Sequence, residues 1–180
     1  IILYPGGKVK TEAYAALALA LADKGLDVYL VRMPFQLAVL DPLRAGRILD
    51  LPESERSPNL AIAGHSLGGA MAVRAVRAHP DDLDEIIFLG SYSDLDIRTL
   101  PVRVLSIGAS EDGLSTPAKI LSYRENLPPD ARLVTLPGGN HAGFGRYGPQ
   151  SGDGTAVLSP EEQQRLVVEA ILSFLAEADT

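Results

Sequence analysis

Residues 64–68 read Gly-His-Ser-Leu-Gly, and they stand between an apolar run at 60–63 and a run of helix formers at 70–76. This order predicts a strand, a sharp turn and a helix, with Ser66 at the turn. A serine raised on so tight a turn needs an unusual backbone conformation, and a side chain two residues to either side would strike the neighbouring strand or helix. Glycine at 64 and 68 removes both clashes.

The chemistry of this turn favours a nucleophile at Ser66. The following helix directs its N-terminus at the serine, so the N–H of Leu67 faces negative charge developing on an attacked carbonyl. A serine hydroxyl is a weak nucleophile at neutral pH unless a base removes its proton, and that base needs a carboxylate to orient it. The alternative is a glycine-rich turn that serves only close packing.

Two later loops supply the base and the acid. A predicted strand at 102–108 leads into Asp112, and a predicted strand at 131–136 leads into His141. Because the C-terminal ends of parallel strands share one edge of a sheet, Ser66, Asp112 and His141 are expected to meet there. Asp112 is the candidate orienting acid, with Glu111 as the neighbouring alternative. Taken singly, the acid could cap a turn and the histidine could be solvated.

The chain order of serine, aspartate and histidine, together with the elbow at Ser66, resembles the α/β-hydrolase superfamily over nearly the whole chain. Segment 138–154 is similar to small, single-domain bacterial members that are related in shape to dienelactone hydrolases. Dienelactone hydrolases carry a cysteine nucleophile, and this chain has no cysteine, so a dienelactone hydrolase proper is not expected. The family pattern places the acid directly before Gly-Leu, which selects Asp112.

The resemblance also implies an oxyanion hole with two backbone donors, Leu67 and Gly7. In this superfamily the second donor comes from the loop after the first strand seen here, which is expected at 1–4. Pro5 stands where the family usually has histidine, and this departure leaves the backbone donor intact.

Continuous apolar runs such as 86–89 indicate a sheet that is covered on both faces. The fold class is therefore predicted as α/β, a mostly parallel sheet with helices on both faces, which is the minimal α/β-hydrolase fold. We expect strands at 1–4, 26–32, 60–63, 84–89, 102–108 and 131–136, helices at about 11–24, 67–79, 117–126 and 160–177, and a less regular segment at 36–57.

The domain prediction is a single α/β-hydrolase domain over 1–180. No cap domain fits between Ser66 and Asp112 once the strand at 84–89 and its crossovers are placed. The chain opens with Ile1 already inside a strand and without an initiator methionine, so upstream strands and any signal or anchor are expected to be missing. Localisation is left unknown.

The composition and net charge limit the classes of molecule that the protein is expected to bind. Hydrophobic residues make up 46% of the chain and charged residues 22%, which suits a folded domain with a solvated surface. The net charge of −7, without a basic cluster interleaved with aromatics, argues against nucleic acid or anionic membranes. Three scattered histidines and no cysteine offer no zinc spacing, so no metal and no cofactor are expected. The expected partner is a small-molecule acyl substrate, and the oligomeric state is left open.

These observations predict a serine hydrolase that cleaves small carboxylic esters through an acyl-enzyme. The same triad could serve thioester or amide cleavage or acyl transfer, and a non-catalytic binding scaffold is the alternative from another class. An uncapped site suits small or extended acyl substrates. Met33, Phe35 and Tyr92 follow strand ends and are expected to line the substrate wall, unless they only pack under loops.

The glycine-rich loop at 138–154 is expected to cover part of the site. Gln150 and Asp153 would hold it through polar contacts, and Phe144 or Tyr147 would give an apolar edge. A mobile surface loop is the alternative. His65 is not expected to be a base, because its position inside the elbow favours local packing or hydrogen bonding.

Overall fold

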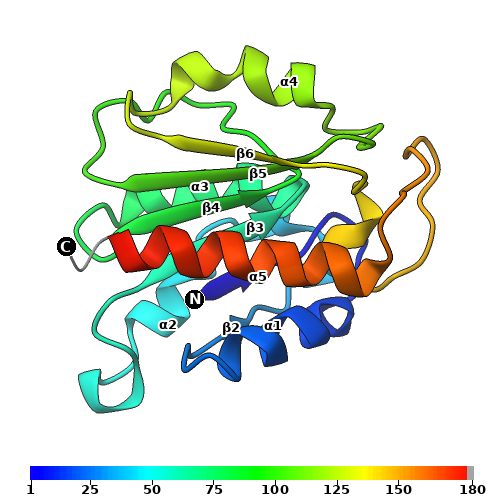
Figure 1. Ribbon diagram of the computed structural model, residues 1–180. Helices are drawn as coiled ribbons and strands as arrows, with labels where there is room; N and C mark the ends of the chain where they lie inside the picture. Colours follow the sequence, from blue (N-terminus) through cyan, green and yellow to red (C-terminus); the bar gives the residue numbers. More distant parts are fainter. Residues whose placement is uncertain (178–180) are drawn as a thin grey trace.

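Six parallel strands form one twisted sheet at the centre of the protein in the computed structural model, which describes residues 1–177 (Figure 1). Their order across the sheet is β2-β1-β3-β4-β5-β6, and every neighbouring pair is parallel. The strands are β1 (Ile2–Tyr4), β2 (Tyr29–Leu30), β3 (Ala61–His65), β4 (Glu85–Leu89), β5 (Arg103–Ala109) and β6 (Arg132–Leu136).

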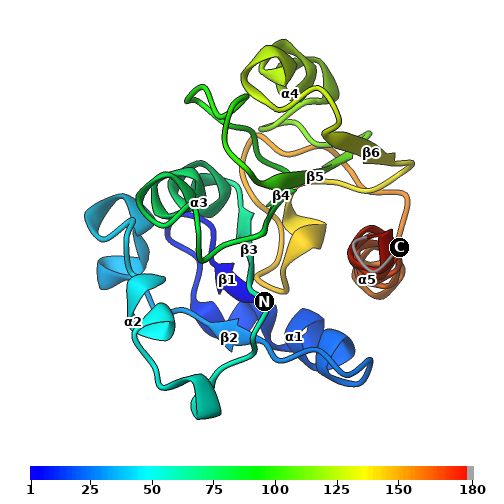
Figure 2. The same ribbon diagram turned by 90° about the vertical axis from the view of Figure 1, so that its left-hand side faces the viewer.

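Helices cover both faces of the sheet, as the apolar runs predict. Figure 2 shows α3 on one face and α1 with α5 on the other. The α-helices are α1 (Ala15–Ala22), α2 (Gly46–Leu49), α3 (Leu67–Ala78), α4 (Pro117–Ser122) and α5 (Pro160–Ala176). Short 3-10 turns are η1 (Thr11–Tyr14), η2 (Pro34–Gln36), η3 (Ala38–Leu40), η4 (Glu53–Glu55), η5 (Arg124–Asn126) and η6 (Ala142–Phe144).

The central strand β4 explains why its sequence is continuously apolar. Ile86 and Phe88 pack into the core on the α3 side, whereas Ile87 and Leu89 pack into the core on the α1 and α5 side. All four side chains are fully buried. A strand with helices on both faces has no solvent-facing side, so it lacks the alternation of an exposed strand.

The largest departure from the sequence prediction lies at the edge of the sheet. The strand expected at 26–32 forms ladder pairs only at Tyr29 and Leu30, because β2 has a single neighbour, the three-residue β1. The segment expected to be irregular at 36–57 contains α2 and short 3-10 turns. The helix expected from about residue 11 begins as the 3-10 turn η1.

The long C-terminal helix α5 begins where the capping signal places it. The Ser159 side chain accepts a hydrogen bond from the Glu162 backbone, the Glu162 carboxylate accepts one from the Ser159 backbone, and Pro160 occupies the first turn. No helix in the described range 1–177 is long and apolar enough to cross a bilayer.

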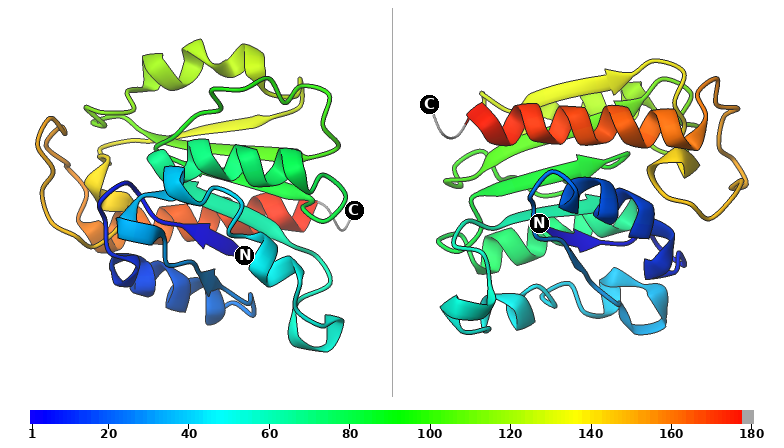
Figure 3. Two further views of the ribbon diagram at one scale, coloured as in Figure 1. Left: turned by 180° about the vertical axis from the view of Figure 1, so that it is seen from behind. Right: turned by 60° about the horizontal axis from the view of Figure 1, so that its bottom comes forward.

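The topology brings the ends of β3, β5 and β6 to one edge of the sheet. Between Ser66 and Asp112 the described chain contains α3, β4, β5 and their connections, without an inserted cap. After η6 the segment 145–158 (orange) loops outward before it enters α5 (Figure 3). This edge contains the candidate site.

Candidate active site

Ser66 occupies a strained backbone conformation between β3 and α3. Its φ of 52° and ψ of −123° are unusual for a residue with a side chain. The turn is held by a hydrogen bond from Ser66 N to Leu89 O (3.0 Å) and by one from the Ser91 hydroxyl to Ser66 O (2.7 Å). The neighbouring strand end therefore fixes the elbow on both sides of the serine.

The two glycines of the elbow are required by close backbone approach. A Cβ on Gly64 would lie 2.5 Å from the carbonyl carbon of Gly68. A Cβ on Gly68 would lie 2.6 Å from the Tyr4 carbonyl oxygen and closer still to that of Pro5. Since these obstacles are backbone atoms, they cannot rotate away, and the predicted reason for glycine at both positions is confirmed.

The two predicted oxyanion donors lie next to each other. Leu67 is the first residue of α3, and Gly7 packs so closely on it that a Cβ at Gly7 would lie 3.0 Å from Leu67 Cδ2. Within the described part of the chain, neither backbone N–H donates a hydrogen bond. The positive end of the α3 dipole adds to the attraction for an anion at this point.

Asp112 and His141 form a buried, hydrogen-bonded pair. The Asp112 Oδ2 atom lies 2.8 Å from His141 Nδ1, and the two side chains are 0% and 1% exposed. The other carboxylate oxygen accepts hydrogen bonds from the backbone N–H groups of Leu114 (2.8 Å) and Ser115 (2.6 Å). Glu111, in contrast, is exposed and accepts a hydrogen bond from the Ser110 hydroxyl.

The remaining ring nitrogen of His141 is the atom that a nucleophile would need. His141 Nε2 is buried and has no hydrogen-bond partner among residues 1–177. The described interactions include none that joins it to the Ser66 hydroxyl. The ring nevertheless lies beside the elbow, because its centroid is 4.5 Å from that of His65, the residue before the serine.

His65 lies in a ring cluster and is neutral at pH 7. Its ring centroid is 5.7 Å from that of Phe144 and 6.1 Å from that of Tyr147. Burial lowers the pKa of His65 well below its ordinary value, and the nearby His141 lowers it further. Its Nδ1 lies 2.6 Å from the hydroxyl of Tyr14, which is 51 positions away in the sequence, so the hydrogen bond is not local to the elbow.

Asp153 fixes the loop that carries His141. One carboxylate oxygen accepts hydrogen bonds from the backbone N–H groups of His141 (3.1 Å) and Gly113 (3.2 Å), and the other accepts one from Ala142 N (2.8 Å). The predicted polar contacts of Asp153 are confirmed. Gln150 instead accepts a hydrogen bond from the Tyr147 hydroxyl within the same loop, and so does not tie the loop to the sheet.

Gln163 supports the same loop and was not predicted from the sequence. Its side chain accepts a hydrogen bond from Asn140 N (3.0 Å) and donates one to Asn140 O (2.7 Å). Gly139 and Gly143 pack against it so closely that a Cβ on either would overlap the Gln163 amide. The available signal was the pair of polar residues Gln163 and Gln164 at the start of the apolar face of α5.

The three residues expected to line a substrate wall lie in separate environments. Met33 is buried in the core on the α3 side. Phe35 is 88% exposed, with a positive φ of 49°. Tyr92 stacks on Tyr123 with ring centroids 4.2 Å apart. None of the described contacts joins these three side chains to one another.

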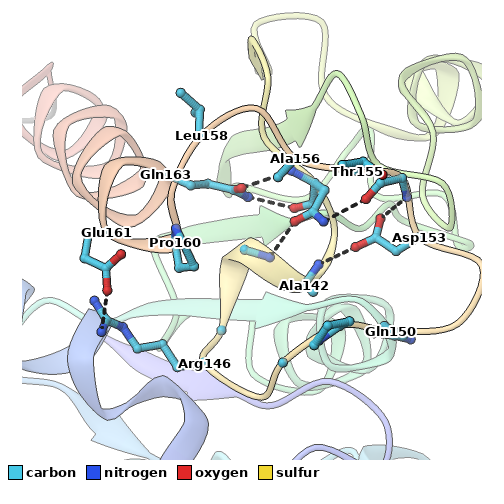
Figure 4. Close-up of a pocket in the computed structure, with 16 residues that line it drawn as sticks. Ala142, Arg146, Gln150, Asp153, Thr155, Ala156, Leu158, Pro160, Glu161 and Gln163 are labelled. Atoms are coloured by element: carbon cyan, nitrogen blue, oxygen red, sulfur yellow. Dashed lines mark hydrogen bonds and ion pairs between the residues drawn. The ribbon is translucent and has the colours of Figure 1, made fainter.

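A cavity of about 620 Å³ lies behind the His141 loop (Figure 4). Ala142, Asp153 and Gln163 line it, and the Arg146–Glu161 ion pair (2.8 Å) crosses one side. Neither Ser66 nor His141 is among its lining residues. The residues on either side of His141, Asn140 and Ala142, do line the cavity, whereas Asp112 does not.

The chain belongs to the alpha/beta hydrolase family, whose family model matches residues 1–165. The solved structures that it resembles include a predicted CIB-like hydrolase from Thermoplasma acidophilum, at 19% identity, a TM-score of 0.66, and coverage of 94% of this chain and 84% of that one.

Two further solved structures share the fold. The dienelactone hydrolase from Anabaena variabilis is 18% identical with a TM-score of 0.68, covering 96% of this chain and 85% of that chain. The monoacylglycerol lipase from Paleococcus ferrophilus is 16% identical with a TM-score of 0.65, covering 96% and 93%. A comparison with curated protein sequences gave no match. At these identities the likeness establishes the fold.

Proposed function

We propose that this protein is a serine hydrolase that cleaves small carboxylic esters. The observation that carries the proposal is the buried Asp112–His141 hydrogen bond, which leaves His141 Nε2 without a partner beside the Ser66 elbow. An Asp-oriented imidazole with one free nitrogen is the base that a serine nucleophile requires.

In the first half of the reaction, Ser66 Oγ bonds to the ester carbonyl carbon while its proton passes to His141 Nε2. The carbonyl oxygen becomes an anion and accepts hydrogen bonds from the N–H groups of Gly7 and Leu67. The imidazolium is stabilised by Asp112. When the carbon–oxygen bond to the leaving group breaks, His141 returns the proton to the departing alkoxide, and an acyl-serine remains.

In the second half, water attacks the acyl-serine. His141 Nε2 takes a proton from the water as its oxygen bonds to the acyl carbon, and the same two N–H groups hold the oxyanion. The proton then passes to Ser66 Oγ as the acyl bond breaks, which releases the carboxylic acid. Proton transfer requires Ser66 Oγ to lie within hydrogen-bond reach of His141 Nε2, and such contacts commonly tighten in the complex with substrate.

Two features of the structure support the proposal that the substrates are small or extended esters. Segment 67–111 carries no cap over Ser66, so the elbow is open to solvent on that side. Ser66 and Leu67 are themselves half-buried rather than enclosed. A series of p-nitrophenyl esters from acetate upward measures the chain-length preference, and we expect kcat/KM to be highest for the short esters.

A fluorophosphonate probe followed by mass spectrometry tests the assignment. The wild-type protein should be labelled at Ser66, and Ser66→Ala should be unlabelled and lose about 10³-fold or more of its turnover of p-nitrophenyl acetate. His141→Ala should lose a similar factor. Ser122→Ala is the matched control, because the Ser122 hydroxyl is exposed and bonds only to Lys119 O. Equal turnover by the folded Ser66→Ala and wild-type proteins would overturn the proposal.

A further inference from the structure

Tyr14 connects the loop at 5–7, called here the oxyanion loop because it contains the proposed donor Gly7, to His65, the residue before Ser66. Its hydroxyl accepts a hydrogen bond from Gly6 N (2.9 Å) and lies 2.6 Å from His65 Nδ1. Tyr14 is fully buried and His65 is 1% exposed. A Cβ on Gly6 would lie 2.8 Å from His65 Nδ1 and 3.1 Å from the Tyr14 oxygen, so the three groups meet without spare room.

The positions of the protons follow from burial. Burial raises the pKa of the Tyr14 hydroxyl, which therefore stays protonated at neutral pH. Among the described hydrogen bonds, His65 Nδ1 is the one acceptor within reach of the Tyr14 hydroxyl proton, so this proton points to the neutral imidazole of His65. This arrangement places the His65 proton on Nε2, the nitrogen on the other side of the ring.

The loop at 6–7 needs such an anchor because two successive glycines leave its backbone free to rotate. The Gly6 carbonyl oxygen accepts a hydrogen bond from Val9 N (3.2 Å), and in a trans peptide the N–H of Gly7 points the opposite way. The Tyr14 hydroxyl accepts a hydrogen bond from the Gly6 N–H, and the Val9 N–H donates one to the Gly6 carbonyl. With both sides of Gly6 fixed, the direction of the Gly7 N–H is set as well, and Gly7 itself packs against Leu67.

We propose that Tyr14 is a positioning residue for the oxyanion hole: its hydroxyl takes the Gly6 N–H and thereby aims the next amide, Gly7 N–H, at the oxyanion. This proposal rests on the function proposed above. The oxyanion forms only in the transition state, so misaligning one of its donors raises the barrier without weakening binding of the substrate. A structural role alone would lower stability and leave catalysis unchanged.

Tyr14→Phe removes the hydroxyl and keeps the ring. We expect kcat for p-nitrophenyl acetate to fall by about 10- to 100-fold with KM nearly unchanged, somewhat less than the loss for deleting an oxyanion donor outright. The affinity for a trifluoromethyl ketone, which forms a tetrahedral oxyanion on the serine, should weaken by the same factor as kcat.

Tyr4→Phe is the matched control. Tyr4 is also fully buried, and its hydroxyl also accepts from a backbone amide, Ala45 N (2.6 Å), and donates to a backbone carbonyl, Pro42 O (3.0 Å). Its hydrogen bonds hold the segment before α2 rather than the oxyanion loop. Tyr4→Phe should lower the melting temperature to a similar extent and keep the wild-type kcat and ketone affinity.

A folded Tyr14→Phe protein with wild-type kcat and ketone affinity would overturn the proposal while leaving the triad intact. If Tyr14→Phe does not fold, His65→Asn, which removes the imidazole acceptor of the Tyr14 hydroxyl, should lower kcat at unchanged KM; unchanged kcat would again overturn the proposal. Failure of the proposed function gives a different result, since Ser66 would then not be labelled in the wild-type protein, and the positioning role would fall with it.

Discussion

The carboxylate of Asp153 accepts a hydrogen bond from the backbone N–H of His141, at 3.1 Å. The two residues lie on the same loop, and the same carboxylate also reaches Ala142 N and Gly113 N. Gly113 directly follows Asp112. A single side chain therefore ties the loop of the candidate base to the loop of the candidate acid.

Asp153→Ala should lower both stability and esterase activity. Four backbone N–H groups, those of Gly113, His141, Ala142 and Gly154, would lose a carboxylate acceptor, and we expect a loss of about 2 kcal/mol in the free energy of unfolding. Displacement of the His141 backbone should lower kcat by about 10- to 100-fold. Urea unfolding and p-nitrophenyl acetate kinetics measure the two effects. Gln150→Ala, which removes only the contact with the Tyr147 hydroxyl, is the control and should change neither by much.

Gly68→Ala should destabilise the protein by about 1–3 kcal/mol or more, although alanine favours helices over glycine. The added methyl group would overlap the carbonyl oxygens of Tyr4 and Pro5. Gly46→Ala, also in a helix, meets only His79 Nε2 at 3.7 Å and should be neutral or stabilising by up to about 1 kcal/mol. Thermal melting followed by circular dichroism compares the two. Equal melting temperatures would contradict the steric explanation of the elbow.

Gln163→Leu and Gln164→Leu should differ sharply although the residues are neighbours. Gln163→Leu leaves the N–H and C=O of Asn140 without their partner, which costs about 1–3 kcal/mol for each buried group. Gln164 Nε2 is already buried without a hydrogen-bond partner among the described residues, and its Oε1 accepts only a long hydrogen bond (3.3 Å) from Arg146. Gln164→Leu should stay within about 1 kcal/mol of wild type. Chemical denaturation of both variants measures the difference.

The buried, neutral His65 predicts that stability is lost in mild acid. Burial, and then His141, hold its pKa well below the value of about 6.5 expected in the unfolded chain. Between these two values the unfolded state binds more protons than the folded state, so the free energy of unfolding falls as the pH is lowered below about 6.5. Above that pH the contribution is fully present.

The variant His65→Asn measures the contribution of His65 to this pH dependence, because it removes the titrating imidazole and keeps the surrounding residues Tyr14, His141 and Tyr147. Urea denaturation at about pH 7.5, 6.5 and 5.5 should give a shallower pH dependence for the variant than for the wild type. Parallel curves for the two proteins would show that His65 does not contribute to acid sensitivity.

The elbow and the strand ends could be predicted from sequence because their causes are local. Glycine is required at 64 and 68 because the turn brings backbone atoms close to both positions. A continuous apolar run such as Ile86 to Leu89 indicates a strand covered on both faces. Parallel topology then places residues that follow strand ends at one edge. That argument placed His141 and the pair Glu111 and Asp112 at one edge, and the family resemblance selected Asp112. The side chains of Asp112 and His141 form a hydrogen bond in the structure.

The partners of the loops were decided only by the tertiary structure. Tyr14 binds Gly6 and approaches His65 across 51 positions, and Gln163 binds Asn140 across 23. Such hydrogen bonds depend on where the elements pack, and no local period or motif marks them. Phe35 is exposed and Met33 is buried for the same reason, because their exposure depends on which distant segments pack against them. The sequence therefore determined the candidate residues Ser66, Asp112 and His141, because turn sterics and periodicity are local properties of the chain, whereas packing between distant elements decided which residues hold them in position.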